Sequence, residues 1–305
     1  MNIRQGSIRL FRFAGIDLFL HWSWFLVAAF EIQNRAGGYS SLTWNVLEYV
    51  ALFVIVMVHE FGHALACRQV GGTSNQIVLW PLGGVAYVNP PPRPGAMLWS
   101  IAAGPLVNVA LVPILWTLGP VGRASGWADS MPNAYAFLHA VWLINLGLLI
   151  FNMLPIYPLD GGQIFRSLLW FVLGRARSLL VATIVGFVGV AGLIALAVWM
   201  RSAWFAILSV FILMNCWQGL QQALVLSRMA KSPRRAGFVC PSCKAAPLLG
   251  AHWICGHCKQ PFDTFQTQAV CPSCAAQYPM TSCLDCGGLN PMWAWIGPAP
   301  APRPL

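Results

Sequence analysis

Six long apolar segments constrain the fold of this chain more than any other feature of its sequence. A transmembrane helix needs about 20 predominantly apolar residues, and the chain has only 8 acidic residues in 305 with which to coat a water-facing surface. We therefore predict an all-α polytopic membrane protein, with six transmembrane helices in the lipid bilayer. The predicted spans are residues 16–33, 46–67, 96–118, 134–154, 178–200 and 203–224.

Residues Gln76–Asn89, between the second and third predicted spans, do not continue the helical pattern. Two short apolar runs flank a turn at Pro81–Gly84, and this pattern predicts a short membrane-associated β-hairpin. Gly83 and Gly84 have two interpretations of equal weight. They either form a tight turn that requires glycine or belong to a strand edge that is open to an extended peptide.

The basic residues before position 230 are distributed unequally between the two predicted sides of the membrane. Nine arginines fall on the side of the N-terminus and three on the opposite side, and arginine-rich loops stay in the cytoplasm. We therefore predict a protein of the bacterial inner (cell) membrane with cytoplasmic N- and C-termini. The net charge of +10 then indicates loops that face anionic lipid.

A cluster of ionisable residues, His59, Glu60 and His63, lies within the second predicted span. Two histidines four residues apart lie on one face of a helix and can ligate one zinc ion. Glu60 is close to that face and can act as a general base without occupying a coordination position. Ionisable groups inside an apolar span are costly, so two structural histidines are the less favoured interpretation. A catalytic zinc has three protein ligands, and Asp160, shortly after the fourth span, is the third candidate.

These residues resemble the motifs of the site-two protease family of intramembrane zinc metalloproteases. His59–His63 matches the HExxH helix of that family, and Asn152–Gly162 matches its NxxPxxPLDGG segment. Pro81–Ala86 and Gly104–Asn108 are similar to its hairpin and third-span motifs. The resemblance covers about residues 10–225, and the six-span layout is similar to the branch without a PDZ domain.

The resemblance implies that His59, His63 and Asp160 ligate a catalytic zinc ion and that Glu60 activates water. The expected activity is that of a zinc metalloendopeptidase which hydrolyses a peptide bond in or near a transmembrane segment of a membrane protein substrate, as in regulated intramembrane proteolysis. Zinc would polarise the scissile carbonyl, while the glutamate transfers a proton to the leaving nitrogen.

Four further residues are candidates for substrate binding. A transmembrane substrate must unwind before its carbonyl can reach zinc, and the hairpin at Gly83 and Gly84 could pair with the extended segment. Asn108 and Asn152 are amides in apolar surroundings. One is a candidate donor to substrate or oxyanion and the other a candidate support for the Asp160 loop, with helix packing as an equal alternative for each.

Four C-x-x-C pairs follow the last predicted span. A reducing compartment disfavours disulfides, and such pairs suit tetrahedral zinc, so we predict two structural zinc sites of four cysteines each. The spacing favours sequential pairing, first with second and third with fourth. A cross-braced arrangement, first with third and second with fourth, is the alternative, and iron is a minor alternative to zinc. The pairs are Cys240/Cys243, Cys255/Cys258, Cys271/Cys274 and Cys283/Cys286.

The predicted domain organisation follows from these features. Residues 1–230 form the six-span metalloprotease domain, 231–237 a basic linker that contacts lipid headgroups, 238–288 a cytoplasmic double zinc ribbon and 289–305 a Pro/Ala-rich tail. The ribbons carry too few lysines for a nucleic-acid footprint, so we expect a protein partner there and no nucleic acid.

Two functions of other classes compete with the protease. A zinc transporter would need polar ligands along a route open to both sides of the membrane, and the outer halves of the predicted spans offer none. A membrane-anchored zinc-ribbon interaction module would leave the complete catalytic motif unexplained.

Overall fold

The computed structural model describes residues 6–34, 39–80 and 83–295. The chain divides into two compact units, which are described separately. Unit 1 comprises Met1–Pro90 with Pro94–Gln221, and unit 2 comprises Pro91–Arg93 with Gln222–Leu305.

Five described helices are long and apolar enough to cross a membrane, and they correspond to the predicted spans from residue 46 onward. α4, Trp127–Ser130, is a short helix between two of them. The fold is therefore a polytopic helical membrane protein, as predicted. The five helices are α2 (Leu42–Gln69), α3 (Pro94–Ala124), α5 (Pro132–Asn152), α6 (Asp160–Met200) and α7 (Ala203–Lys231).

The first predicted span, residues 16–33, is wrong as a single helix. Its first part is strand β2, Ile16–His21, and its second part begins helix α1, Ser23–Asn34, which has 12 residues. That length falls well short of the 20 residues or so that a bilayer requires. Ile16 and Leu18 are fully buried in the protein, so their hydrophobicity serves the core and not a lipid-facing helix.

The predicted β-hairpin is confirmed as part of a larger sheet. Strands β3, Thr73–Trp80, and β4, Gly83–Asn89, pair antiparallel with Trp80 opposite Gly83. β1, Ser7–Phe13, pairs antiparallel with β2, and β2 pairs parallel with β3, which gives the order β1-β2-β3-β4. β4 is therefore an edge strand of this sheet.

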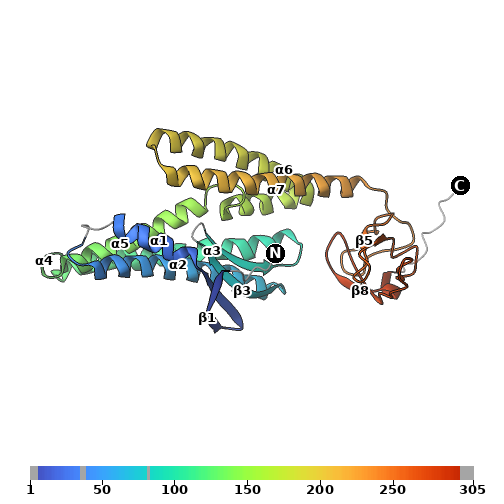
Figure 1. Ribbon diagram of the computed structural model, residues 1–305, viewed down its shortest axis with the longest axis horizontal. Coiled ribbons are helices and arrows are strands. Elements are labelled where there is room, and N and C mark those ends of the chain that lie inside the picture. The colour runs from blue at the N-terminus through green and yellow to red at the C-terminus, as the bar shows by residue number, and fades with distance from the viewer. Residues whose placement is uncertain (1–5, 35–38, 81–82, 296–305) are drawn as a thin grey trace. The chain divides into compact units, whose positions relative to one another are not determined.

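The sheet packs against the part of α2 that carries the clustered histidines. Ile16 and Leu18 of β2 share a buried core with Ile77 and Leu79 of β3 and with Phe61 of α2. The strands accordingly lie against the C-terminal half of α2 in Figure 1. This contact fixes the sheet next to the helix turn on which metal chemistry was predicted.

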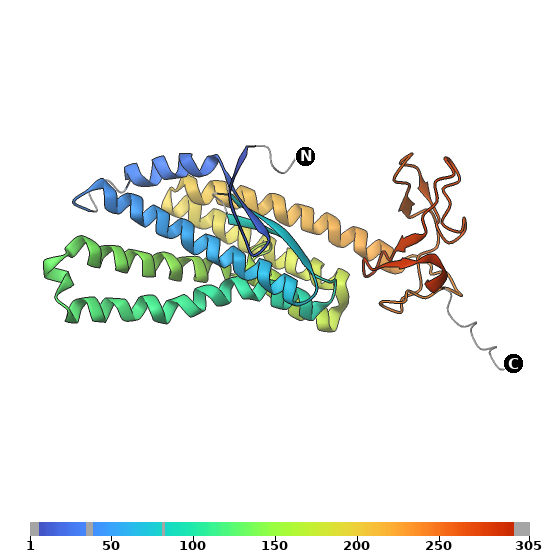
Figure 2. The ribbon, with the colours of Figure 1, turned by 90° about the horizontal axis from the view of Figure 1, so that it is seen from below.

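The spanning helices of unit 1 bring distant segments of the chain together. α2 packs against α3 and α5, and α3 also packs against α6; Figure 2 shows α2, α3 and α5 running side by side. α6 is divided at Gly174, whose φ of 76° and ψ of 172° lie outside the helical region. The part of α6 before this break begins at Asp160, and the part after it holds the predicted span 178–200.

Unit 2 is built from short hairpins around a core of aromatic rings and cysteines. Trp295 is fully buried in that core, so ordered structure continues past residue 288 into the segment predicted as a tail; residues 296–305 of that prediction lie outside the described residues. The elements are β5 (Trp253–Ile254), β6 (Pro261–Phe262), β7 (Met280–Ser282), β8 (Leu289–Pro291) and the 3₁₀ helix η1 (Met292–Trp295).

The predicted basic linker is part of unit 2. Arg234 lies 2.5 Å from Asp285 and Arg235 lies 2.5 Å from Asp263. The carboxylates of the same unit therefore engage these two guanidinium groups, which were expected to contact lipid headgroups.

Candidate metal centres

Three potential zinc ligands converge between α2 and the beginning of α6. His59 Nε2 lies 3.1 Å from His63 Nε2 and 3.0 Å from Asp160 Oδ2, and His63 Nε2 lies 3.4 Å from the same oxygen. Bonds of about 2.0–2.1 Å to a tetrahedral ion would separate its ligand atoms by about 3.3 Å. The three atoms therefore have the spacing of ligands around a single zinc ion.

The hydrogen bonds of both imidazoles leave the converging nitrogens free to bind a metal. His59 Nδ1–H donates to Asn108 Oδ1 over 2.5 Å, and His63 Nδ1–H donates to the Ser100 carbonyl over 2.9 Å. In this tautomer each Nε2 is unprotonated, and its lone pair is free to bind a metal ion. Asp160 Oδ2 is buried and accepts no hydrogen bond from the described residues. A cation satisfies all three atoms at once, so the residues fit a zinc ion.

Glu60 is placed for acid–base chemistry beside this centre. Its side chain is buried, and a carboxylate oxygen lies within 4.8 Å of a ring nitrogen of His59 and of His63. A carboxylate within this limit is close enough to reach a metal-bound water. Glu60 therefore lies beside the converging ligands, where a general base would be needed.

Gly104 of α3 allows the backbone of that helix to approach the two histidines. A Cβ atom at this position would lie 2.3 Å from His63 Nε2 and 2.8 Å from His59 Nε2. Any side chain would occupy the place of the metal ligands. Gly104 was predicted only as part of a motif, because the approach of α3 to α2 is a tertiary contact that the sequence pattern does not contain.

Asn108, predicted to bind substrate, is fully buried and holds His59 in place. Its Nδ2 donates to Asn145 Oδ1 over 2.8 Å, and Asn145 Nδ2 donates back to the main-chain carbonyl of Asn108 over 3.1 Å. Together with the bond from His59, these contacts engage both ends of the Asn108 amide. The geometry favours a positioning role. Sequence reasoning missed Asn145, although a second amide within an apolar span was a sign that could have revealed it.

The other three predicted substrate-binding residues lie outside the converging ligands. Asn152 is the last residue of α5 and is half-buried. Gly83 and Gly84 begin β4, opposite Trp80 and Leu79 of β3. Contact of these three residues with a substrate stays a prediction.

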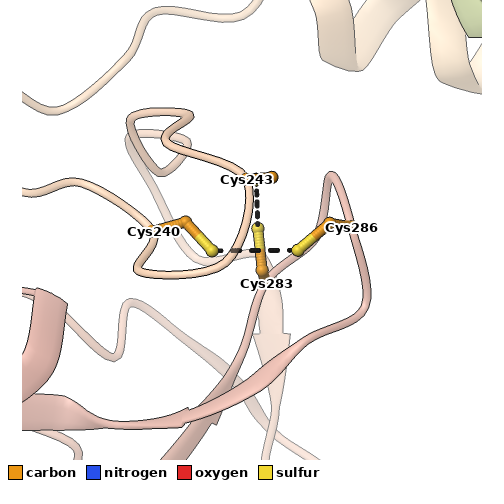
Figure 3. Close-up of side chains that lie close together, drawn as sticks. All are labelled: Cys240, Cys243, Cys283 and Cys286. Atoms are coloured by element: carbon orange, nitrogen blue, oxygen red, sulfur yellow. Dashed lines mark hydrogen bonds between the residues drawn. The ribbon is translucent and has the colours of Figure 1, made fainter. Parts of the chain in front are cut away.

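The eight paired cysteines form two clusters whose pairing is nested. The first C-x-x-C pair meets the fourth, and the second meets the third, so the predicted sequential pairing and the cross-braced alternative are both wrong. Figure 3 shows Cys240 and Cys243 facing Cys283 and Cys286. The second cluster contains Cys255, Cys258, Cys271 and Cys274.

The sulfur atoms have the spacing of a tetrahedral metal site. Facing Sγ atoms are 3.7 and 3.8 Å apart in the first cluster, which contains Cys240. They are 3.5 and 3.6 Å apart in the second cluster, which contains Cys255. Four thiolates bound to zinc at about 2.3 Å would be about 3.8 Å apart, whereas a disulfide brings sulfurs to about 2.05 Å. Both clusters therefore fit a zinc ion.

All four C-x-x-C pairs share one backbone conformation. The backbone N–H of the first cysteine in each pair, at position i, donates to the carbonyl of residue i+5. The N–H of residue i+4, the fourth position after that cysteine, donates to the carbonyl of the same cysteine. The residue at that fourth position has positive φ in each case, which is unfavourable for any residue but glycine. Three of the four are not glycine, so the surrounding site imposes this turn. They are Lys244 (64°), Lys259 (63°), Ala275 (56°) and Gly287 (68°).

Tyr278 favours the metal-binding form of one cysteine. Its hydroxyl lies 3.0 Å from Cys255 Sγ, and this hydrogen bond lowers the pKa of Cys255 to about 5. The thiolate is the form that binds metal, and it predominates at neutral pH for this side chain.

Comparisons with known proteins agree with the geometry of unit 1. The model of "Peptidase family M50" matches residues 48–123 and 117–196, which contain all three converging ligands and Glu60. A solved site-2 protease from Methanocaldococcus jannaschii superposes with a TM-score of 0.53 at 30% sequence identity, covering 70% of this chain and 95% of that one.

Curated relatives extend the comparison. A zinc metalloprotease of M. jannaschii is 35% identical over 184 residues, which are 59% of this chain and 50% of the relative. The putative zinc metalloprotease Rip3 of Mycobacterium tuberculosis is 31% identical over 179 residues, 54% of this chain and 44% of the relative. Stage IV sporulation protein FB of Bacillus subtilis is 32% identical over 127 residues, 40% of each chain. The chain spans about half the length of the curated relatives it matches.

Proposed function

Because this chain belongs to peptidase family M50, the family of the site-2 protease, we propose that it is a zinc-dependent intramembrane endopeptidase. Its substrate is a membrane protein, cleaved in or near a transmembrane segment. The convergence of His59, His63 and Asp160 beside Glu60 is the observation that carries this proposal. The competing transporter and anchor functions have no comparable support.

The proposed site residues have separate roles. His59, His63 and Asp160 hold the catalytic zinc, which when bound supplies a Lewis acid for the scissile carbonyl and makes a water molecule more acidic. Glu60 takes a proton from the attacking water and gives it to the leaving nitrogen. Asn108 holds the imidazole of His59 in the tautomer that leaves Nε2 free.

We propose that β4 receives the unwound substrate. It is the edge strand of the four-stranded sheet, and an edge strand can pair with an extended peptide through main-chain hydrogen bonds. Gly83 and Gly84 lie at the start of this strand. The sheet shares a core with Phe61, the residue after Glu60, which supports a substrate path close to the ligands. Asn152 is proposed to support the loop that leads to Asp160.

The proposed surroundings of the site follow from charge and composition. Of the eight arginines from residue 68 to residue 228, six fall on the side of the C-terminal end of α2, which supports a cytoplasmic C-terminus in a bacterial inner membrane. Arg68 at that end binds the carbonyls of Ala14 and Gly15, which supports a cytoplasmic N-terminus as well. The two cysteine clusters support two structural zinc ions in a cytoplasmic ribbon domain, and we propose a protein partner for that domain. We propose that residues 1–230 form the protease domain.

Replacing Glu60 by glutamine tests the proposed activity. Full-length Glu60→Gln, co-expressed with a membrane protein substrate, should keep its zinc but lose cleavage by at least about 100-fold, the typical contribution of a general base. Immunoblotting of the substrate fragments and metal analysis of the purified chain measure the two effects.

The matched control is Glu48→Gln. Glu48 is a second buried glutamate on α2 and accepts a hydrogen bond from Tyr39. This variant should retain cleavage. Undiminished cleavage by Glu60→Gln would contradict the proposed function.

A further inference from the structure

Arg166 is a buried cation in the first part of α6. Only 9% of its surface is exposed, and its Nε atom is buried without a hydrogen-bond partner among the described residues. Arginine stays protonated in proteins, and a buried charge is unfavourable unless an opposite charge compensates it. The surroundings of Arg166 therefore require an anion.

The described carboxylates near the core of unit 1 are engaged elsewhere. Asp160 lies six residues before Arg166, about 120° away around the helix at 100° per residue, and its Oδ2 faces the two histidines. Glu48 accepts a hydrogen bond from Tyr39, and Glu60 belongs to the histidine cluster. No ion pair joins Arg166 to a carboxylate within the described part of the chain, which points to an anion from outside it.

A second arginine lies beside the same aromatic ring. The guanidinium carbons of Arg166 and Arg175 are 6.0 and 5.8 Å from the centre of the Trp170 ring. Trp170 is one helical turn after Arg166, and Arg175 follows the break at Gly174. The break thus places two positive charges around one indole, and an anion bound between them would relieve their repulsion.

Several residues between the two arginines are apolar and exposed. Leu168, Phe171 and Val172 are exposed, Val172 to 84%. In a membrane protein such side chains contact lipid acyl chains. The site thus combines paired cations, an indole and an apolar surface, which is the chemistry of a phospholipid with an anionic headgroup.

We propose that Arg166, Arg175 and Trp170 bind the phosphate of an anionic phospholipid whose acyl chains lie along residues 168–173. Bound lipid neutralises the buried guanidinium and stabilises the first part of α6, which begins with Asp160. This inference is independent of the proposed proteolysis and requires no cleavage assay.

Lipid-dependent thermal unfolding of the purified full-length chain in detergent tests the site. Phosphatidylglycerol should raise the unfolding temperature more than zwitterionic phosphatidylcholine. Arg166→Gln should weaken the apparent affinity for phosphatidylglycerol by at least about fivefold, the effect of one arginine at an anionic membrane surface. Arg175→Gln should reduce it as well, and it serves as the test if Arg166→Gln does not fold.

Arg201→Gln is the control, because Arg201 is an exposed arginine at the opposite end of α6. It should keep the full response to phosphatidylglycerol. Three results would each overturn the proposal: equal stabilisation by both lipids, an unchanged response in folded Arg166→Gln or Arg175→Gln, or full stabilisation by inorganic phosphate alone.

Discussion

At the scale of single residues, the ionisable side chains of the site were predictable, because burying such groups in an apolar span is energetically unfavourable. His59, Glu60, His63 and Asp160 stand out because few other ionisable residues occur in these segments. The groups that orient them were harder to find. The carbonyl of Ser100 binds His63 through the backbone, so its side chain carries no information about the role. Whether Asn108 faces a histidine or a substrate depends on the packing of α2 and α3, which sequence spacing does not give.

The close approach at Gly104 leads to a test at this scale. Gly104→Ala places a methyl group 2.3 Å from Nε2 of His63, so a histidine or α3 must move. We expect this variant to lose one zinc ion per chain and its proteolytic activity, measured by metal analysis and substrate cleavage. Gly119→Ala on the same helix has no atom within 4 Å of the added methyl and should keep both. Full zinc content in Gly104→Ala would refute this account of the helix approach.

At the scale of elements, hydrophobic length predicted five spans and failed for the first. Residues 16–21 are apolar enough for a span, but β1 and β3 pair with them on both sides. Arg68 at the end of α2 fixes this arrangement by donating to the carbonyls of Ala14 and Gly15 over 2.5 and 3.0 Å. The pairing of β2 with β3 and the contacts of Arg68 join segments more than 50 residues apart, so a local apolar pattern does not contain them.

The break in α6 gives a second test. The φ and ψ of Gly174 lie in a region that only glycine adopts readily, and Gly174→Ala should reduce the free energy of unfolding by about 1–3 kcal/mol. Gly192→Ala, on the same helix with nothing within 4 Å of the added methyl, should instead be neutral or stabilising by up to about 1 kcal/mol. Denaturant unfolding in detergent compares the two. Equal effects would mean that α6 is not broken at Gly174.

At the scale of the whole molecule, the cysteines that bind metal were predictable, and the way in which their C-x-x-C pairs combine into two sites was not. The C-x-x-C spacing identified eight metal-binding cysteines, but the nested pairing depends on how the hairpins that carry them meet. The extent of unit 2 was also underestimated, because the buried Trp295 lies beyond the last cysteine in a segment whose composition resembles a tail. Two of the three candidate metal centres thus join segments that are distant in sequence: the cluster of Cys240, Cys243, Cys283 and Cys286, and the centre between α2 and the beginning of α6.

Zinc stoichiometry of the purified full-length chain tests the central claim most directly. The three centres predict three zinc ions per chain, and Asp160→Ala should leave two because only the ion between α2 and α6 is lost. Asp129→Ala, an exposed aspartate on α4, should still bind three. Retention of all three ions by Asp160→Ala would contradict a site in which that carboxylate and the two histidines hold one metal.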